Sequence, residues 1–138
     1  MSSIFSNADE FYKARNFSEA LLYYQEIVVP DDKLSLKLYQ KQQLGNCYMM
    51  LGQYYKAIDF YNEIISLQEN NAVGYANIAL CLMQEGKSMD AFHYLIQVSN
   101  SNIEFSESHE KILKDVTSQV EAKLIFEPSI FNNWMKDK

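Results

Sequence analysis

A stretch of 18 residues occurs three times in this chain. NADEFYKARNFSEALLYY begins at Asn7, LGNCYMMLGQYYKAIDFY follows 37 residues later at Leu44, and IALCLMQEGKSMDAFHYL begins 34 residues after that at Ile78. A repeat of 20–50 residues is typical of proteins in which each copy is one supersecondary unit that buries its apolar face against its neighbours. The sequence therefore predicts a repeat array.

Alignment of the three copies separates small positions from large ones. Small residues recur at two positions, occupied by Ala8, Gly45 and Ala79 and by Ala20, Ala57 and Ala91. Large apolar residues recur at others, occupied by Phe11, Tyr48 and Leu82, by Tyr24, Tyr61 and Leu95, and by Ile27, Ile64 and Val98. Two helices that cross closely need this mixture, because a large side chain at the crossing point would push them apart.

Glycine marks the turn within two of the copies. Gly52 and Gly86 each end an apolar-periodic segment and precede another, where a residue at positive φ stops one helix and turns the chain. The first copy has Arg15-Asn16 instead, and we expect Asn16 to make this turn because asparagine tolerates the left-handed region.

Leu44-Gly45, Tyr48, Gly52, Ala57 and Tyr61 resemble the tetratricopeptide repeat, whose pattern is L-G-x2-Y followed by A-x3-F. The resemblance covers roughly residues 1–104 and implies an all-α, right-handed superhelical solenoid of three helix–turn–helix repeats. We predict these repeats at approximately 1–34, 38–71 and 72–104, within a single domain over 1–138.

A capping helix is predicted after the third repeat. Ser101 and Glu104 form an S-x-x-E start signal, and apolar residues then follow helical spacing until Pro128. We place the cap at approximately 105–126, where it would cover the last repeat. The tail, 127–138, contains Ile130, Phe131, Trp134 and Met135, and either packs on the cap or binds a partner.

The net charge of −6, from 12 basic and 18 acidic residues, argues against a general electrostatic grip on nucleic acid or anionic lipid. The start of the chain lacks the pattern of a secretory leader, and the longest apolar run, Ile78 to Met83, is too short to span a membrane. We therefore expect a cytoplasmic protein without direct membrane insertion.

Nothing in the sequence indicates catalysis, a cofactor or a metal site. Cys47 and Cys81 are separated by the repeat period, so each is interpreted as a small packing residue and a free thiol. His93 and His109 lack partners at metal-ligand spacing, and we expect both on solvated helical faces. We predict that the protein is not an enzyme.

The first helix of each repeat has one face that does not pack against the second helix. We predict as partner-binding the residues Phe5, Tyr12, Tyr39, Gln42, Asn46, Met49, Val73, Leu80 and Met83. This groove is mainly apolar and aromatic, with methionines that adapt to varied partners, so it suits a protein or peptide segment with apolar anchors. For Leu80, and for Ala76 beside it, filling the interior of the coil is an equal alternative.

LGNCYMMLGQYYKAI, ALCLMQEGK and EFSESHEKILKDV follow one another in an order similar to the translocator chaperones of type III secretion. That resemblance implies a chaperone that holds an apolar segment of a partner in its groove. Capture of a chaperone's C-terminal carboxylate is disfavoured, since Asp9 would repel it. The alternative function is a scaffold or assembly subunit that binds through its convex face or C-terminal tail. The sequence leaves self-association open.

Overall fold

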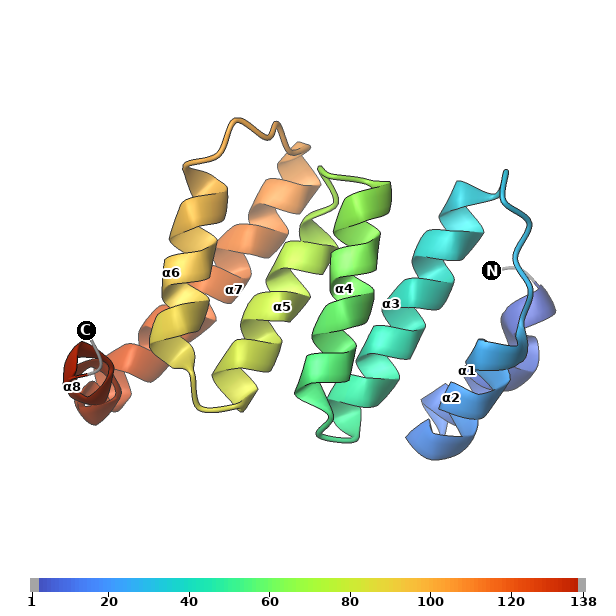
Figure 1. The fold of residues 1–138 in the computed structure, drawn as a ribbon, viewed down its shortest axis with the longest axis horizontal. Coiled ribbons are helices and arrows are strands. Elements are labelled where there is room, and N and C mark those ends of the chain that lie inside the picture. The colour runs from blue at the N-terminus through green and yellow to red at the C-terminus, as the bar shows by residue number, and fades with distance from the viewer. Residues whose placement is uncertain (1–2, 137–138) are drawn as a thin grey trace. The chain divides into compact units, whose positions relative to one another are not determined.

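The computed structural model describes residues 3–136, and no strand occurs within that range. The helices form two compact units whose boundary lies between Leu67 and Gln68 (Figure 1). The all-α class and the succession of helix–turn–helix repeats predicted from the sequence are confirmed. The single domain over 1–138 stays a prediction.

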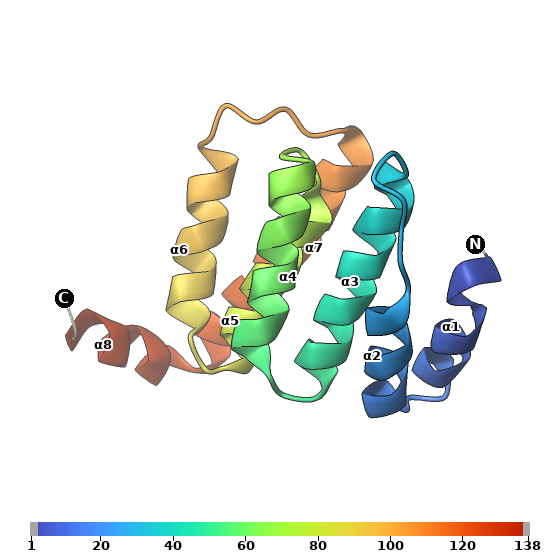
Figure 2. The same ribbon diagram turned by 45° about the vertical axis from the view of Figure 1, so that its right-hand side comes forward.

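Unit 1 contains the first two predicted repeats. A short 3-10 helix, η1 (Ser3–Phe5), precedes α1 (Ser6–Lys13), α2 (Phe17–Glu26), α3 (Leu34–Met50) and α4 (Tyr54–Leu67). Each α-helix packs against the next along the chain (Figure 2). Helix α3 begins earlier than the predicted repeat start at 38, directly after a turn in which the Lys33 amide donates to the Pro30 carbonyl at 3.1 Å.

Unit 2 contains the third repeat and the cap. The repeat consists of α5 (Ala72–Gln84) and α6 (Ser88–Ser99), and α7 (Glu107–Phe126) packs against both of them. Val116 and Val120 of α7 are buried in one cluster with Ala91 and Leu95 of α6. This burial confirms that the helix before Pro128 covers the apolar side of the last repeat.

The cap helix begins close to the predicted residue 105, but the predicted start signal at Ser101 and Glu104 does not cap it. Helix α7 is capped by Ser106, whose hydroxyl accepts a hydrogen bond from the His109 amide at 3.3 Å. The hydroxyl of Ser101 instead donates to the Val98 carbonyl at 2.6 Å, so it satisfies the last turn of α6. Phe105, just before α7, packs edge-on against Tyr75 with ring centroids 5.8 Å apart.

The three turns within the repeats have the same geometry. Gly52 and Gly86 have φ of +77° and +82°, as predicted, but in the first repeat the residue at positive φ is Arg15, at 63°, and not Asn16. The amides of Asn16, Gln53 and Lys87 then close each turn by bonding the carbonyl five residues earlier, at 2.8–2.9 Å. Asn16 is therefore the residue after the left-handed one.

The small positions lie where the helices of a pair approach closely. Ala8, Ala20, Ala57, Ala79 and Ala91 are at most 1% exposed. A Cβ added to Gly45 would meet the Tyr61 ring at 2.7 Å. The predicted reason for small residues at these positions is thus confirmed.

The tail forms α8 (Pro128–Lys136), which packs against α6 and α7. Trp134 is half-buried and Met135 is 50% exposed, whereas the side chains of Ile130 and Phe131 lie outside the described part of the structure. Among the helices described, none combines the length and the apolar character that crossing a membrane requires.

Candidate protein-binding site

Five of the predicted partner-binding residues lie on helices of unit 1 and are half-buried. They are Tyr12 on α1 and Tyr39, Gln42, Asn46 and Met49 on α3. The α3 residues follow one another at spacings of three or four, which places them on one side of the helix. We refer to these five residues together with Asp9, which is also half-buried, as the first-helix face of unit 1.

Phe5 has to be removed from the predicted surface. Its side chain is 0% exposed, and its ring packs edge-on against Tyr39 with centroids 4.9 Å apart. Because η1 turns the chain just before α1, Phe5 points into the core of unit 1 and does not extend the first-helix face.

A chain of polar contacts connects all four α-helices of unit 1 beneath this face. The hydroxyls of Tyr24 on α2 and Tyr39 on α3 both donate to Oδ1 of Asp9, the latter at 2.7 Å. Gln43 donates to the Tyr24 hydroxyl at 3.1 Å and accepts from Asn46 at 3.2 Å. Tyr61 on α4 joins this network through a hydrogen bond from its hydroxyl to Asn46. Networks of this kind fix the positions of the side chains that they join.

The same tyrosine contact occurs in both repeats of unit 1. Tyr61 donates to Oδ1 of Asn46 at 2.6 Å, just as Tyr24 donates to Oδ1 of Asp9. Both tyrosines are 0% exposed, and each reaches from the second helix of its repeat to the first. The third repeat has Leu80 and Leu95 at these positions, so an apolar pair replaces the hydrogen bond.

The tyrosines of this network are held in their protonated form. Burial, and then the hydrogen bond to Asp9, raises the pKa of Tyr39 to about 12. The same two causes raise the pKa of Tyr24 further. Burial also raises the pKa of Tyr12, which the side chain of Asn46 partly opposes by hydrogen bonding. At neutral pH these hydroxyls therefore remain donors.

The unit 2 residues of the predicted site lie on α5. Val73, Leu80 and Met83 are half-buried, and Leu80 and Met83 pack against the buried cluster of unit 2. Ala76 is 2% exposed and belongs to that cluster. The alternative weighed for Ala76, that it fills the interior, is therefore the one that the structure supports.

Sequence reasoning missed the polar character of unit 1. Asp9 was considered only as a charge that would repel a carboxylate, and Tyr24 and Tyr61 only as large packing residues. The hydroxyls of Tyr24 and Tyr61 nevertheless bond to residues of the face. The signal was present in the alignment, since Asp9 and Asn46 share one repeat position and Tyr24 and Tyr61 share another.

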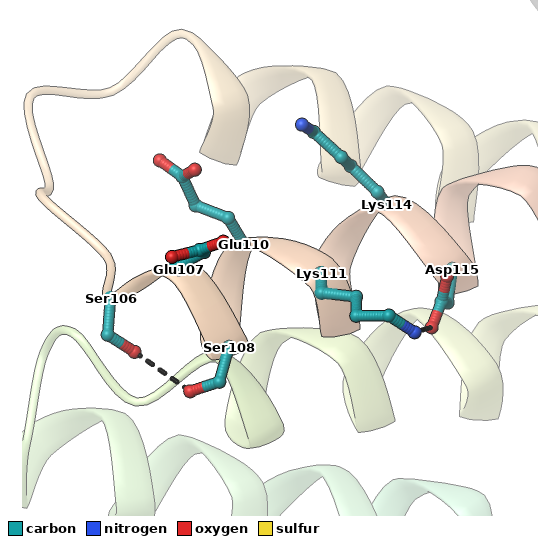
Figure 3. A pocket seen from close by; sticks show the side chains of 7 residues that line it. All are labelled: Ser106, Glu107, Ser108, Glu110, Lys111, Lys114 and Asp115. Carbon is teal, nitrogen blue, oxygen red and sulfur yellow. Dashed lines mark hydrogen bonds and ion pairs between the residues drawn. The ribbon is translucent and has the colours of Figure 1, made fainter.

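A hollow of about 760 Å³ at the start of α7 does not make a better site. Its lining comes from one segment, with Glu107, Glu110, Lys114 and the ion pair Lys111–Asp115 at 3.4 Å (Figure 3). Acidic residues in a first helical turn are favourable for the helix itself. The hollow is therefore a stretch of solvated charges along one helix, and we do not assign it as a binding site.

The histidines and cysteines do not form a chemical site. His93 is exposed as expected, but His109 is not on a solvated face, because its Nδ1 accepts from the Ala72 amide at 3.0 Å and so caps α5. Cys47 and Cys81 are free and buried, as predicted, and burial raises the pKa of each thiol to about 12. Within residues 3–136, no group of three or more His, Cys, Asp or Glu side chains is placed to hold a metal.

Residues 42–71 match the family model of the tetratricopeptide repeat, which confirms the repeat type predicted from the sequence. A curated human relative, "Intraflagellar transport protein 88 homolog", is 32% identical over 93 residues. The match covers 64% of this chain but only 11% of that relative, so the chain spans a small part of the relative's length.

Solved structures with a similar fold include tetratricopeptide-repeat proteins. The type III secretion chaperone SycD of Yersinia enterocolitica, in complex with a peptide of the translocator YopD, has a TM-score of 0.64 and 21% identity, covering 87% of this chain and 91% of that one. A C-terminal tetratricopeptide domain of a Plasmodium falciparum FK506-binding protein has a TM-score of 0.63 and 20% identity, and the match covers 91% of this chain and 89% of that one. The Hsp90 co-chaperone Cns1 of Saccharomyces cerevisiae has a TM-score of 0.67 and 16% identity, and the match covers 97% of this chain and 43% of that one. At these identities the likeness concerns the fold.

Proposed function

We propose that this chain is a non-catalytic, cytoplasmic protein-binding module that holds an apolar segment of a partner protein on the first-helix face of unit 1. Tetratricopeptide-repeat proteins mediate protein–protein interactions, and residues 42–71 match that repeat. The observation that carries the proposal is the set of half-buried aromatic, amide and methionine side chains on α1 and α3. Hydrogen bonds from Tyr39 to Asp9 and from Tyr61 to Asn46 hold this set in place.

The physical case rests on preorganisation. The hydroxyl of Tyr39 already bonds Asp9, and the ring of Tyr12 packs edge-on against Phe17, so little side-chain entropy remains to be lost on binding. Met49 adds an adaptable apolar contact. Oδ1 of Asn46 accepts only the bond from Tyr61 and keeps a second acceptor site, which can orient a backbone N–H of an extended segment.

A chaperone role is the specific form of this proposal. SycD is described as a chaperone in complex with a peptide of a translocator, and Cns1 as a co-chaperone. Both have folds similar to that of this chain. By analogy the partner segment here would be kept soluble while its apolar anchors are covered.

A display library of random dodecapeptides tests the proposal. Peptides selected on the wild-type protein should contain two or more apolar anchors, and Gln42→Glu with Met49→Glu should weaken their binding by at least tenfold, since the anchors would then face charges. Tyr39 is unsuitable for this test because its hydroxyl bonds Asp9.

A matched control changes the same charge elsewhere in unit 1. Ser18→Glu with Asn62→Glu, at exposed positions on α2 and α4, should leave peptide binding and the melting temperature unchanged. Loss of binding in the control but not in the face variant would refute the assignment. Affinity capture from native cells, followed by mass spectrometry, would then identify the natural partner.

A second candidate function is assembly through the C-terminal region. Ile125 and Phe126 are 75% and 83% exposed at the end of α7, and Met135 on α8 is 50% exposed. Exposed apolar residues that lie together mark protein contacts. If Ile125→Ser with Phe126→Ser releases captured proteins while the face variant does not, assembly is the function. Light scattering on the same variant reports self-association.

A further inference from the structure

Asp9 is the only acidic member of the first-helix face, and the equivalent position of repeat two carries no charge. In repeat two the same position holds Asn46, which accepts the hydroxyl of Tyr61 as Asp9 accepts that of Tyr24. In repeat three it holds Leu80. Because a neutral amide accepts the second-helix tyrosine in repeat two, that contact does not require a charge, and a carboxylate is costly to keep half-buried.

We propose that Asp9 binds a cationic side chain of the partner, so that the segment held on unit 1 carries a lysine or arginine beside its apolar anchors. This inference rests on the proposed function and specifies the class of segment. It assigns Asp9 as the residue that determines specificity for charge, whereas Tyr12 and Met49 contact the apolar anchors.

The geometry around Asp9 leaves an acceptor free for such a group. Tyr24 and Tyr39 both donate to Oδ1, so neither of these bonds uses Oδ2. A charged N–H donor at Oδ2 would form a hydrogen bond stronger than a neutral one. The rings of Tyr12 and Tyr39, on the same face, offer a cation additional favourable contact through their π electrons.

No cation within residues 3–136 forms an ion pair with Asp9. Lys13, four residues further along α1, is exposed, and Cζ of Arg15 lies 5.5 Å from the centroid of the Phe17 ring. The net charge of −6 favours the approach of a basic segment over an acidic one.

The test compares wild type with Asp9→Asn, which copies the residue of repeat two. Random dodecapeptides are selected on each protein, after circular dichroism has confirmed equal helical content. Peptides selected on wild type should be enriched in Lys and Arg relative to the unselected library, and those selected on Asp9→Asn should not. Equal enrichment on both proteins, or none on wild type, overturns the assignment of Asp9 but leaves the proposed function standing. Failure to select any peptide overturns both.

A change on the peptide keeps the test independent of the folding of the variant. The basic residue of one selected peptide is replaced by norleucine, and binding to wild type is measured by fluorescence anisotropy. We expect the dissociation constant to rise about tenfold, between the effects of an exposed ion pair and of a buried charged hydrogen bond. The affinity of the basic peptide should also fall as salt is added. An unchanged dissociation constant would overturn the inference.

Discussion

Replacement of Gly45 by alanine tests the central packing argument of unit 1. In an unobstructed helix this change stabilises by about 1 kcal/mol, because glycine loses more backbone entropy on folding. We expect the opposite here. An added Cβ would lie 2.7 Å from Cε1 and 2.9 Å from Cζ of Tyr61, and real Cβ atoms do not approach other atoms so closely.

The magnitude follows from how firmly Tyr61 is held. Its ring is 0% exposed, and its hydroxyl donates to Asn46 at 2.6 Å, so the ring can retreat only by disturbing the core or by losing this bond. Overpacking costs about 1–3 kcal/mol, and loss of a buried hydrogen bond adds about 1 kcal/mol. After subtraction of the helix-propensity gain, we expect Gly45→Ala to lower the free energy of unfolding by about 1–3 kcal/mol.

Urea unfolding followed by far-ultraviolet circular dichroism measures this change, and a double-mutant cycle identifies its cause. The third repeat combines Ala79 with Leu95 at the two equivalent positions. Gly45→Ala should therefore cost less in a Tyr61→Leu background than in wild type. An increase in stability from Gly45→Ala alone, or an equal cost in both backgrounds, would show that the Tyr61 ring does not limit this position.

Three further predictions concern other parts of the chain. Arg15→Gly should raise the free energy of unfolding by about 0.5–1 kcal/mol, since it relieves a left-handed non-glycine residue at the expense of a cation–π contact with Phe17; a decrease in urea titrations would contradict this. The buried thiols of Cys47 and Cys81, with pKa raised to about 12, should react slowly with a thiol reagent in the native protein and rapidly in denaturant; fast native labelling would count against it. Because the pKa of Tyr39 rises to about 12 in the folded state, its contribution to stability should be complete below pH 10 and lost as pH rises through 12, which unfolding at increasing pH should show.

The repeat architecture was predictable because small and large residues recur at fixed positions. The approach of Gly45 to Tyr61 and the burial of Ala57 follow directly from that alignment. The cap helix was predictable for a similar reason, since the apolar spacing of Val116 and Val120 continues to a proline that stops it.

The features that the sequence did not reveal depend on tertiary contacts. A left-handed Arg15 is unfavourable in isolation and is maintained by the repeat turn around it. Ser101 and Ser106 are both good capping residues, and the hydrogen bond of Ser101 to Val98 decides between them. His109 caps α5, a helix distant in sequence, and spacing cannot reveal such a contact.

The candidate site combines both kinds of information. Helical spacing predicted that Tyr39, Asn46 and Met49 share a side of α3, but not that Tyr39 is already bonded to Asp9. Side-chain hydrogen bonds between helices depend on rotamers and on local separations of the backbone, and neither can be read from periodicity. The first-helix face of unit 1 is consequently more polar than the sequence indicated.

Asp9, Asn46 and Leu80 occupy one repeat position, and comparing them distinguishes the requirements of folding from those of partner binding. The fold accepts a carboxylate or an amide where a tyrosine donates to it, and a leucine where the second helix supplies Leu95. Because packing tolerates a carboxylate, an amide or a leucine here, the requirements of binding can decide which residue occupies this position. Unit 1 accordingly presents charge and amide groups, and α5 of unit 2 presents an apolar surface. Under the proposed function we therefore expect a segment that binds unit 1 to be amphipathic, since a purely apolar peptide would leave the carboxylate of Asp9 desolvated without a partner.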